Sequence, residues 1–223
     1  MNNILVKNDN ISFENEEKDL IINTKILTIN IKGNVILNEI NANSSVETLI
    51  ININKDSCLN YNYYNINKEK KIDIIINISD NAKFYGNIGI IAHEEQNLSV
   101  ETFMNGNNIT NILNIKIITK DMGSTNILVN GHVLKNTRNN IMRESINVLN
   151  ENNSTNRILP NMLVSSSEVM ADHFVTISNC FEDELFYLES KGINKMQAYQ
   201  LIEQGFILEI FDERLQNIII GGE

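Results

Sequence analysis

The chain has 223 residues, with 18 Lys or Arg against 28 Asp or Glu, so its formal net charge is −10. A chain of this length can bury one sizeable core. Its negative charge disfavours nucleic acid and anionic membrane surfaces as partners. The N-terminal residues lack the basic start and apolar run of a targeting peptide, and no apolar stretch approaches the ~20 residues that span a bilayer. These features predict a cytoplasmic protein.

Short runs of β-branched residues fill the chain from Asn3 to about Val148, separated by Asn, Gly, Asp and Ser. Such runs predict strands and turns. The runs recur roughly every 20 to 25 residues, which favours the stacked coils of a parallel β-helix over residues 1–178. An antiparallel sandwich or barrel is the alternative, because hairpins with short turns give a similar pattern. The clearest runs are residues 26–31, 48–53, 72–78, 98–103 and 111–117.

Residues 179–223 change to a helical spacing of three and four, seen at Leu185, Leu188, Ala198, Leu201, Ile202, Gly205 and Phe206. Acidic residues 182–184 predict the start of a first helix, and Gly192 predicts its end. Asn194 is the expected N-cap of a second helix, which would run from Lys195 towards Leu215. We therefore expect two helices after the β-rich body.

Part of the chain carries a distinctive spacing of residues around this junction. The residues are Pro160, Met162, Val164, Val169, His173, Thr176, Glu182, Asp183, Leu185, Phe186, Tyr187, Leu188, Lys191, Gly192, Ile193, Ala198, Gly205 and Phe206. In spacing and residue type this segment resembles the C-terminal signature of the SufB/SufD family of iron–sulfur cluster assembly proteins. The resemblance runs from Pro160 to Phe206 without a gap.

The resemblance implies a right-handed parallel β-helix with a short helical C-terminal subdomain, in agreement with the pattern of strands and helices. It further implies a non-catalytic scaffold that pairs with a SufB/SufD-like partner or with itself. The helices would dock a SufC-like ABC ATPase, through residues that include Glu182, Asp183, Leu185, Phe186, Tyr187, Leu188, Gly192, Ile193, Ala198, Gly205 and Phe206. A transient iron–sulfur cluster is the expected cargo, and the chain has no phosphate-binding glycine motif of its own.

His173 is the first candidate metal ligand, because a neutral imidazole can ligate iron and the family carries a His at this position. Cys180 is the second, since a thiolate is softer and this residue directly precedes a helix start. The chain departs from the family pattern where Phe174 follows the His in place of a Glu, where Ala171 replaces a Cys, and where residues 142–145 contain no Cys. These departures favour either a supporting, SufD-like role or a reduced scaffold with changed chemistry.

Other clusters are interpreted as structural. His93 and the two following Glu residues resemble a metal motif, but no H-E-x-x-H is completed, so a solvated turn is expected. The serines at 165–167 lie close to Asp172 and His173, but no nucleophile elbow surrounds them, which argues against hydrolase chemistry. Two alternative functions share the solenoid fold: a homo-oligomeric structural or interaction protein without a cluster role, and a carbohydrate-active or adhesive solenoid.

Overall fold

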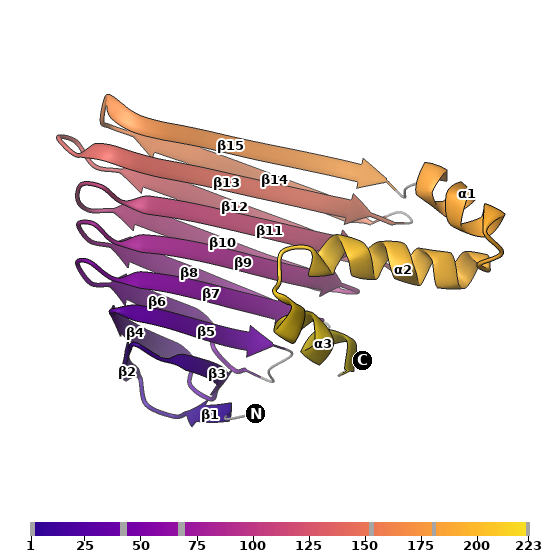
Figure 1. Cartoon of the computed structure of the whole chain (residues 1–223), viewed down its shortest axis with the longest axis horizontal. Helices are drawn as coiled ribbons and strands as arrows, with labels where there is room; N and C mark the ends of the chain where they lie inside the picture. The colour runs from indigo at the N-terminus through magenta and orange to yellow at the C-terminus, as the bar shows by residue number, and fades with distance from the viewer. Residues whose placement is uncertain (1–2, 41–43, 67–69, 152–153, 180–181, 222–223) are drawn as a thin grey trace.

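The computed structural model describes residues 3–40, 44–66, 70–151, 154–179 and 182–221, which form strands β1 to β15 followed by helices α1 to α3 (Figure 1). All strand pairs in these ranges are parallel, and the chain alternates between two sheets. One sheet has the order β1-β3-β5-β7-β9-β11-β13-β15 and the other β14-β12-β10-β8-β6-β4-β2. Each coil therefore gives one strand to each sheet, which confirms the parallel β-solenoid and excludes the antiparallel alternative.

The odd-numbered strands are β1 (Asn3–Val6), β3 (Glu17–Ile22), β5 (Asn34–Ile40), β7 (Cys58–Asn65), β9 (Lys83–Ala92), β11 (Thr110–Thr119), β13 (Arg138–Asn150) and β15 (Glu168–Asn179). The even-numbered strands are β2 (Asn10–Glu14), β4 (Ile26–Lys32), β6 (Thr48–Ile53), β8 (Lys70–Ile78), β10 (Glu95–Met104), β12 (Ser124–Val133) and β14 (Thr155–Val164). The change from strand to helix falls between Asn179 and Glu182.

The coils lengthen towards the C-terminus. Asn10 lies opposite Thr28 in the next coil, whereas near the other end Ser124 lies opposite Thr155, which is a longer interval along the chain. The repeat predicted from the sequence falls between these two intervals. Four of the five predicted runs are strands of the even-numbered sheet. Because each coil contributes one strand to this sheet, the spacing between these four runs is the length of one whole coil. The intervening strands β5, β7 and β9 were not among these runs, because Asn, Tyr and Gly interrupt their aliphatic pattern.

The core lies between the two sheets. In β4, Leu27, Ile29 and Ile31 are buried while their neighbours are more exposed, as the two-residue period of a strand requires. Inward Ile, Leu, Val and Phe side chains from successive coils join in a single cluster that runs from Val6 to Val148. Burial of this apolar surface is the main force that holds the coils together.

Asparagines link the coils along the outer face of the odd-numbered sheet. The Nδ2 of Asn62 donates to Asn38, that of Asn87 to Asn62, and that of Asn114 to Asn87, at 2.8, 3.0 and 3.1 Å. Each inner member of this Asn ladder accepts from the coil after it and donates to the coil before it. When Asn recurs at the same position in successive coils, each side-chain amide is therefore hydrogen-bonded to the Asn of a neighbouring coil. This outward row helps to hold the coils together.

The first two helices are α1 (Glu182–Ser190) and α2 (Lys195–Leu208). Gly192 has φ of +86°, its N–H donates to Glu189, and the N–H of Ile193 donates to Leu188, which is a Schellman ending. The side chain of Asn194 accepts from the backbone of Gln197 at 2.9 Å and caps α2. The predicted end of the first helix and the predicted N-cap of the second are thus confirmed.

The prediction that the second helix continues towards Leu215 is wrong. Helix α2 ends at Leu208, and a third helix, α3 (Glu213–Gly221), begins after Asp212 accepts from the N–H of Leu215 at 2.9 Å. Gln216 Nε2 donates to the carbonyls of Leu208 and Phe211, so backbone groups at the break are satisfied. The break buries Phe211, and the apolar spacing continues across it, which is why the sequence suggests one helix.

The C-terminal part of α2 and helix α3 lie against the outer face of the odd-numbered sheet (Figure 1). Ile207, Phe211 and Leu215 pack there with Tyr64 of β7 and Ile118 of β11. The rings of Tyr64 and Phe211 meet edge to face with centroids 6.2 Å apart. These contacts attach the helices to the middle coils.

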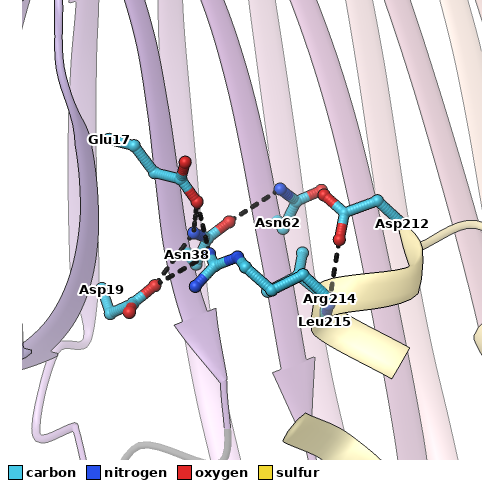
Figure 2. A network of polar contacts seen from close by, with 7 residues as sticks. All are labelled: Glu17, Asp19, Asn38, Asn62, Asp212, Arg214 and Leu215. Carbon is cyan, nitrogen blue, oxygen red and sulfur yellow. Dashed lines mark hydrogen bonds and ion pairs between the residues drawn. The ribbon is translucent and has the colours of Figure 1, made fainter. Parts of the chain in front are cut away.

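A polar network ties α3 to the first coils (Figure 2). Arg214 donates to both Glu17 and Asp19 of β3. Asn38 donates to the same two carboxylates, at 3.3 and 2.9 Å, and accepts from Asn62. The Asn ladder therefore ends at Glu17 and Asp19, and Arg214 of α3 binds the same two carboxylates. This contact joins the first coils to the C-terminal helix.

Candidate functional site

The last coil leaves an open end on the solenoid. Within the described ranges β15 pairs with β13 alone and β14 with β12 alone, so the far edge of each strand has no strand beside it. Figure 1 shows both strands at one extreme of the stack. Free backbone donors and acceptors on such an edge invite a further strand.

Apolar side chains gather on these two strands. The exposed large hydrophobic residues are Leu159, Leu163 and Val164 of β14 and Met170, Phe174, Val175 and Ile177 of β15. In the coils below, the inward positions are buried by the next coil, whereas Val175 and Ile177 have no described coil above them. An apolar surface of this kind marks an interaction site. Strand register places Val164, Val175 and Ile177 on the inward face and the other four residues on the outer faces of the two sheets. We refer to the three inward residues, Val164, Val175 and Ile177, as the open-end patch.

His173 lies on the inward face of β15 within this open end. Strand register places Leu113, Glu144 and His173 side by side in successive coils, and Leu113 and Glu144 are buried in the interior. His173 is exposed because its strand is the last one. Adjacent strands are about 4.8 Å apart, so the backbones of His173 and Glu144 lie one strand spacing apart.

Glu144 is a buried carboxyl that the sequence analysis missed. It is 2% exposed, and neither carboxyl oxygen has a hydrogen-bond partner among the described residues. Burial raises its pKa to about 7. Gly131 leaves room for it, since a Cβ there would come within 2.6 Å of Glu144 Oε1. A signal was present in the sequence: Glu144 occupies an inward position of a strand whose other inward residues are Met142, Ile146 and Val148.

The cysteines do not add to this pair in the described structure. Cys180 lies outside the described residues. Cys58 starts β7, is half-buried, and has a pKa that burial raises, which disfavours a reactive thiolate. Among the residues that the structure describes, no group of three His, Cys, Asp or Glu side chains is placed to hold a metal ion. Any ion at His173 and Glu144 would therefore need further ligands from outside these residues.

His93 lies apart from the open end. Its Nδ1 is 2.7 Å from Asp121 Oδ2, and both side chains are substantially exposed. The two residues sit on the turns that follow β9 and β11. The structure thus places the H-E-E segment in a solvated turn.

A second surface lies between α1 and α2. A cavity of about 470 Å³ is lined by Asp183, Glu184, Tyr187, Leu188, Leu201 and Ile202. Phe186, which precedes Tyr187 in α1 and does not line the cavity, is 75% exposed, and Tyr187, Met196 and Leu201 are also exposed. The two helices thus present an apolar groove with an acidic rim.

The residues that the sequence predicted for docking divide into three groups. Leu185 and Ala198 are buried, and Phe206 is half-buried against the solenoid, with Lys116 Nζ 4.6 Å from its ring centroid. Gly192 and Ile193 form the connection between the helices. The exposed or groove-lining residues are Glu182, Asp183, Phe186, Tyr187, Leu188 and Gly205. Gly192 is also exposed, whereas the side chains of Leu185 and Ala198 are covered by other parts of the chain.

The fold agrees with a family comparison. Residues 30–206 match the model of the SufBD core domain of the SUF system for iron–sulfur cluster assembly. The chain belongs to the SufBD family. The match covers the solenoid from the end of β4 onward and most of the first two helices, so SufBD membership rests on far more than the C-terminal signature.

SufBD relatives in two staphylococci show partial similarity. An iron–sulfur cluster assembly SufBD family protein of Staphylococcus saprophyticus is 34% identical over 95 residues, which cover 41% of this chain and 20% of the relative. A SufBD family protein of Staphylococcus aureus is 34% identical over 77 residues, or 34% of this chain and 16% of the relative. The matched segment thus spans a fifth or less of these relatives.

The matched family model and the names of these relatives both refer to iron–sulfur cluster assembly. The helices in the described ranges are too short or too polar to cross a membrane. The open end and the groove between α1 and α2 are the two candidate binding surfaces.

Proposed function

We propose that this chain is a non-catalytic scaffold subunit of a Suf-type iron–sulfur cluster assembly complex in the cytoplasm. It pairs through its open end with a SufB/SufD-like partner or with a second copy, and it docks a SufC-like ABC ATPase on α1 and α2. The observation that carries the proposal is the open-end patch, two residues of which, Val175 and Ile177, share the inward face of β15 with His173.

Pairing through the open end accounts for two features of the last coil. A partner strand would supply hydrogen bonds to the free edges of β14 and β15. Its side chains would cover Val164, Val175 and Ile177, which are inward in direction but exposed. Burial of this patch favours association because apolar surface leaves water.

The cargo would meet the chain at His173. An imidazole nitrogen and a carboxylate oxygen are both competent donors to iron, and His173 and Glu144 lie in adjacent strands on the inward face. A cation there would favour the ionised form of Glu144 over the protonated one. The partner across the open end would complete the ligand set, which fits a site formed only when two subunits pair.

The groove between α1 and α2 suits the docking of a protein element. Amphipathic helices commonly bind in apolar grooves, and exposed aromatic residues are frequent anchors of interfaces. Phe186 and Tyr187 supply the aromatic side chains, and Asp183 and Glu184 supply an acidic rim for basic groups of the ATPase. Because Ile207 and Phe211 are packed on the solenoid, a force on α1 would reach the coils through α2.

Co-expression with a SufC homologue under anaerobic conditions tests the docking. We expect a stable complex by size-exclusion chromatography, and we expect Phe186→Asp together with Tyr187→Asp to abolish it while circular dichroism of the solenoid stays unchanged. Leu134→Asp, at a residue 45% exposed directly after β12, is the matched control. Leu185→Asp is a poor test because Leu185 is only 8% exposed and its loss would disturb the helix pair itself. A complex that survives the double substitution contradicts this docking surface.

Anaerobic reconstitution with iron and sulfide tests the cargo site. The paired complex should develop charge-transfer absorbance, and His173→Ala should weaken it more than His132→Ala, a change at a His on the outer face of β12. Absence of any absorbance in the paired complex would instead favour a homo-oligomeric structural solenoid without a cluster role.

A further inference from the structure

A cluster of charged side chains joins α2 to the solenoid, away from the open end. Lys120, in the turn after β11, places its Nζ 2.6 Å from Glu203 Oε2 of α2. Both side chains are largely buried, with exposures of 21% for Lys120 and 14% for Glu203. An ion pair that is this well shielded from water is stronger than an ordinary surface pair.

Glu151, directly after β13, adds a second carboxyl to this ion pair. Its side chain is hydrogen-bonded to Glu203, and its Oε1 is buried without a partner among the described residues. Two carboxyl groups can form such a bond only if one of them carries the proton. Burial, the bond to Glu203 and the negative charge of Glu203 raise the pKa of Glu151 to about 7.

The other charged groups around Glu151 act in opposite directions. The Lys120 ammonium lowers the pKa of Glu151, whereas Asp121, the residue after it, raises it. Asp121 is itself held by His93 from the turn after β9, with the two groups 2.7 Å apart. The ammonium group of Lys120 thus lies near three carboxyl groups, those of Glu151, Glu203 and Asp121. The cluster therefore binds a proton more easily than it tolerates a further negative charge.

We propose that Glu151 and Glu203 share a proton that latches α2 to the solenoid, and that loss of this proton frees the α1–α2 arm to move. The position of the latch in α2 supports this role. Phe206, Ile207 and Leu208 pack against the solenoid after Glu203, whereas Met196 and Leu201 before it are exposed. If the contact at Glu203 broke, a longer part of α2 would therefore be free of the solenoid, while α3 would stay packed on the sheet.

The direction of the pH effect follows from the raised pKa. Below the usual Glu value of 4.5 the latch contributes its full stabilisation, and this contribution falls as the pH rises through about 7. Above that pH both carboxyls are ionised and Lys120 can neutralise only one. In combination with the proposed function, the latch would make presentation of the α1–α2 groove to the ATPase depend on pH.

Hydrogen exchange measured by mass spectrometry on the whole chain tests the latch without the ATPase. After correction for the intrinsic exchange rate, we expect protection of residues 195–205 to fall between pH 6 and pH 8, with a limit of about tenfold per pH unit for one proton. Protection of α3 should change little. Equal protection of residues 195–205 at both pH values would overturn the proposal.

Two substitutions distinguish the effect of the shared proton on the pH response from the effect of the ion pairs. Glu151→Gln keeps a hydrogen-bond donor to Glu203 and removes the ionisation, so residues 195–205 should stay protected at pH 8. Glu209→Gln is the matched control, since it removes the other ion pair between α2 and the solenoid, with Lys116, and should leave the pH response intact. A pH response that persists in Glu151→Gln would refute the shared proton. Because no ATPase is present, this outcome is independent of whether the docking proposal holds.

Discussion

His173 of β15 stands in register with Glu144 of β13, one coil earlier in the solenoid. The pair lies on the inward face at the open end, where one residue is exposed and the other is buried without a hydrogen-bond partner among the described residues. Under the proposed function, the cargo would meet one nitrogen donor and one oxygen donor of this chain. A site of that kind needs its remaining ligands from a partner across the open end.

Pairing through the open end predicts a strong effect of charge at Ile177. This side chain is 52% exposed, so Ile177→Lys should change the stability of the isolated chain by only about 0.5 kcal/mol. In a paired complex the same Lys would be buried without a counterion, and the complex should dissociate. Light scattering after size-exclusion chromatography measures the molar mass. Met122→Lys is the control, and equal pairing by both variants would place the interface elsewhere.

Close packing of the helices on β9 predicts opposite effects at two glycines. A Cβ on Gly89 would come within 2.9 Å of the buried Phe211 ring and 3.2 Å of Tyr64. Gly89→Ala should therefore cost about 1 to 3 kcal/mol of stability. Gly205 lies in α2 with nothing near its missing Cβ, so Gly205→Ala should stabilise by about 0.5 to 1 kcal/mol. Urea unfolding measures both, and a neutral Gly89→Ala would contradict the tight contact.

The network of Figure 2 predicts that its buried amide matters more than its ion pair. Asn62 is buried, donates to Asn38 and accepts from Asn87, so Asn62→Ala leaves the buried Asn38 and the half-buried Asn87 without these partners. We expect a loss of about 1 to 3 kcal/mol. Arg214 is half-exposed, and Arg214→Ala should cost less than about 1 kcal/mol. Thermal unfolding of the two variants should rank them in this order, and the reverse order would show that the ion pair dominates.

Glu39 predicts a pH-dependent stability of the early coils. It is fully buried, accepts from Tyr61 Oη at 3.0 Å, and has a pKa that burial raises above 4.5. Its stabilising contribution is complete below about pH 4.5 and decreases as the pH rises towards its folded pKa. Glu39→Gln cannot ionise, so it should gain stability relative to the natural chain between pH 5 and pH 8. Urea unfolding at both pH values checks this, and parallel pH curves for the two chains would be the contrary result.

The local patterns of the chain were enough for much of the fold. Alternating Ile and Leu gave strands such as β4 and β8, and Gly192 and Asn194 marked a helix end and a helix start, because turns and caps depend on residues within a few positions of each other. The break at Phe211 escaped prediction because it is stabilised by burial against Tyr64, a contact between residues far apart in sequence.

By itself, the sequence determined the strand-rich body, the helical end and the resemblance to the SufB/SufD family. The tertiary structure alone decided which residues share an inward column, since the length of a coil changes along the chain and no fixed period links Glu144 to His173. It also decided that Glu203 meets Glu151 and that Arg214 meets Asp19. Such pairs form because the packing of whole coils and helices brings them together, and that packing cannot be predicted from local sequence preferences.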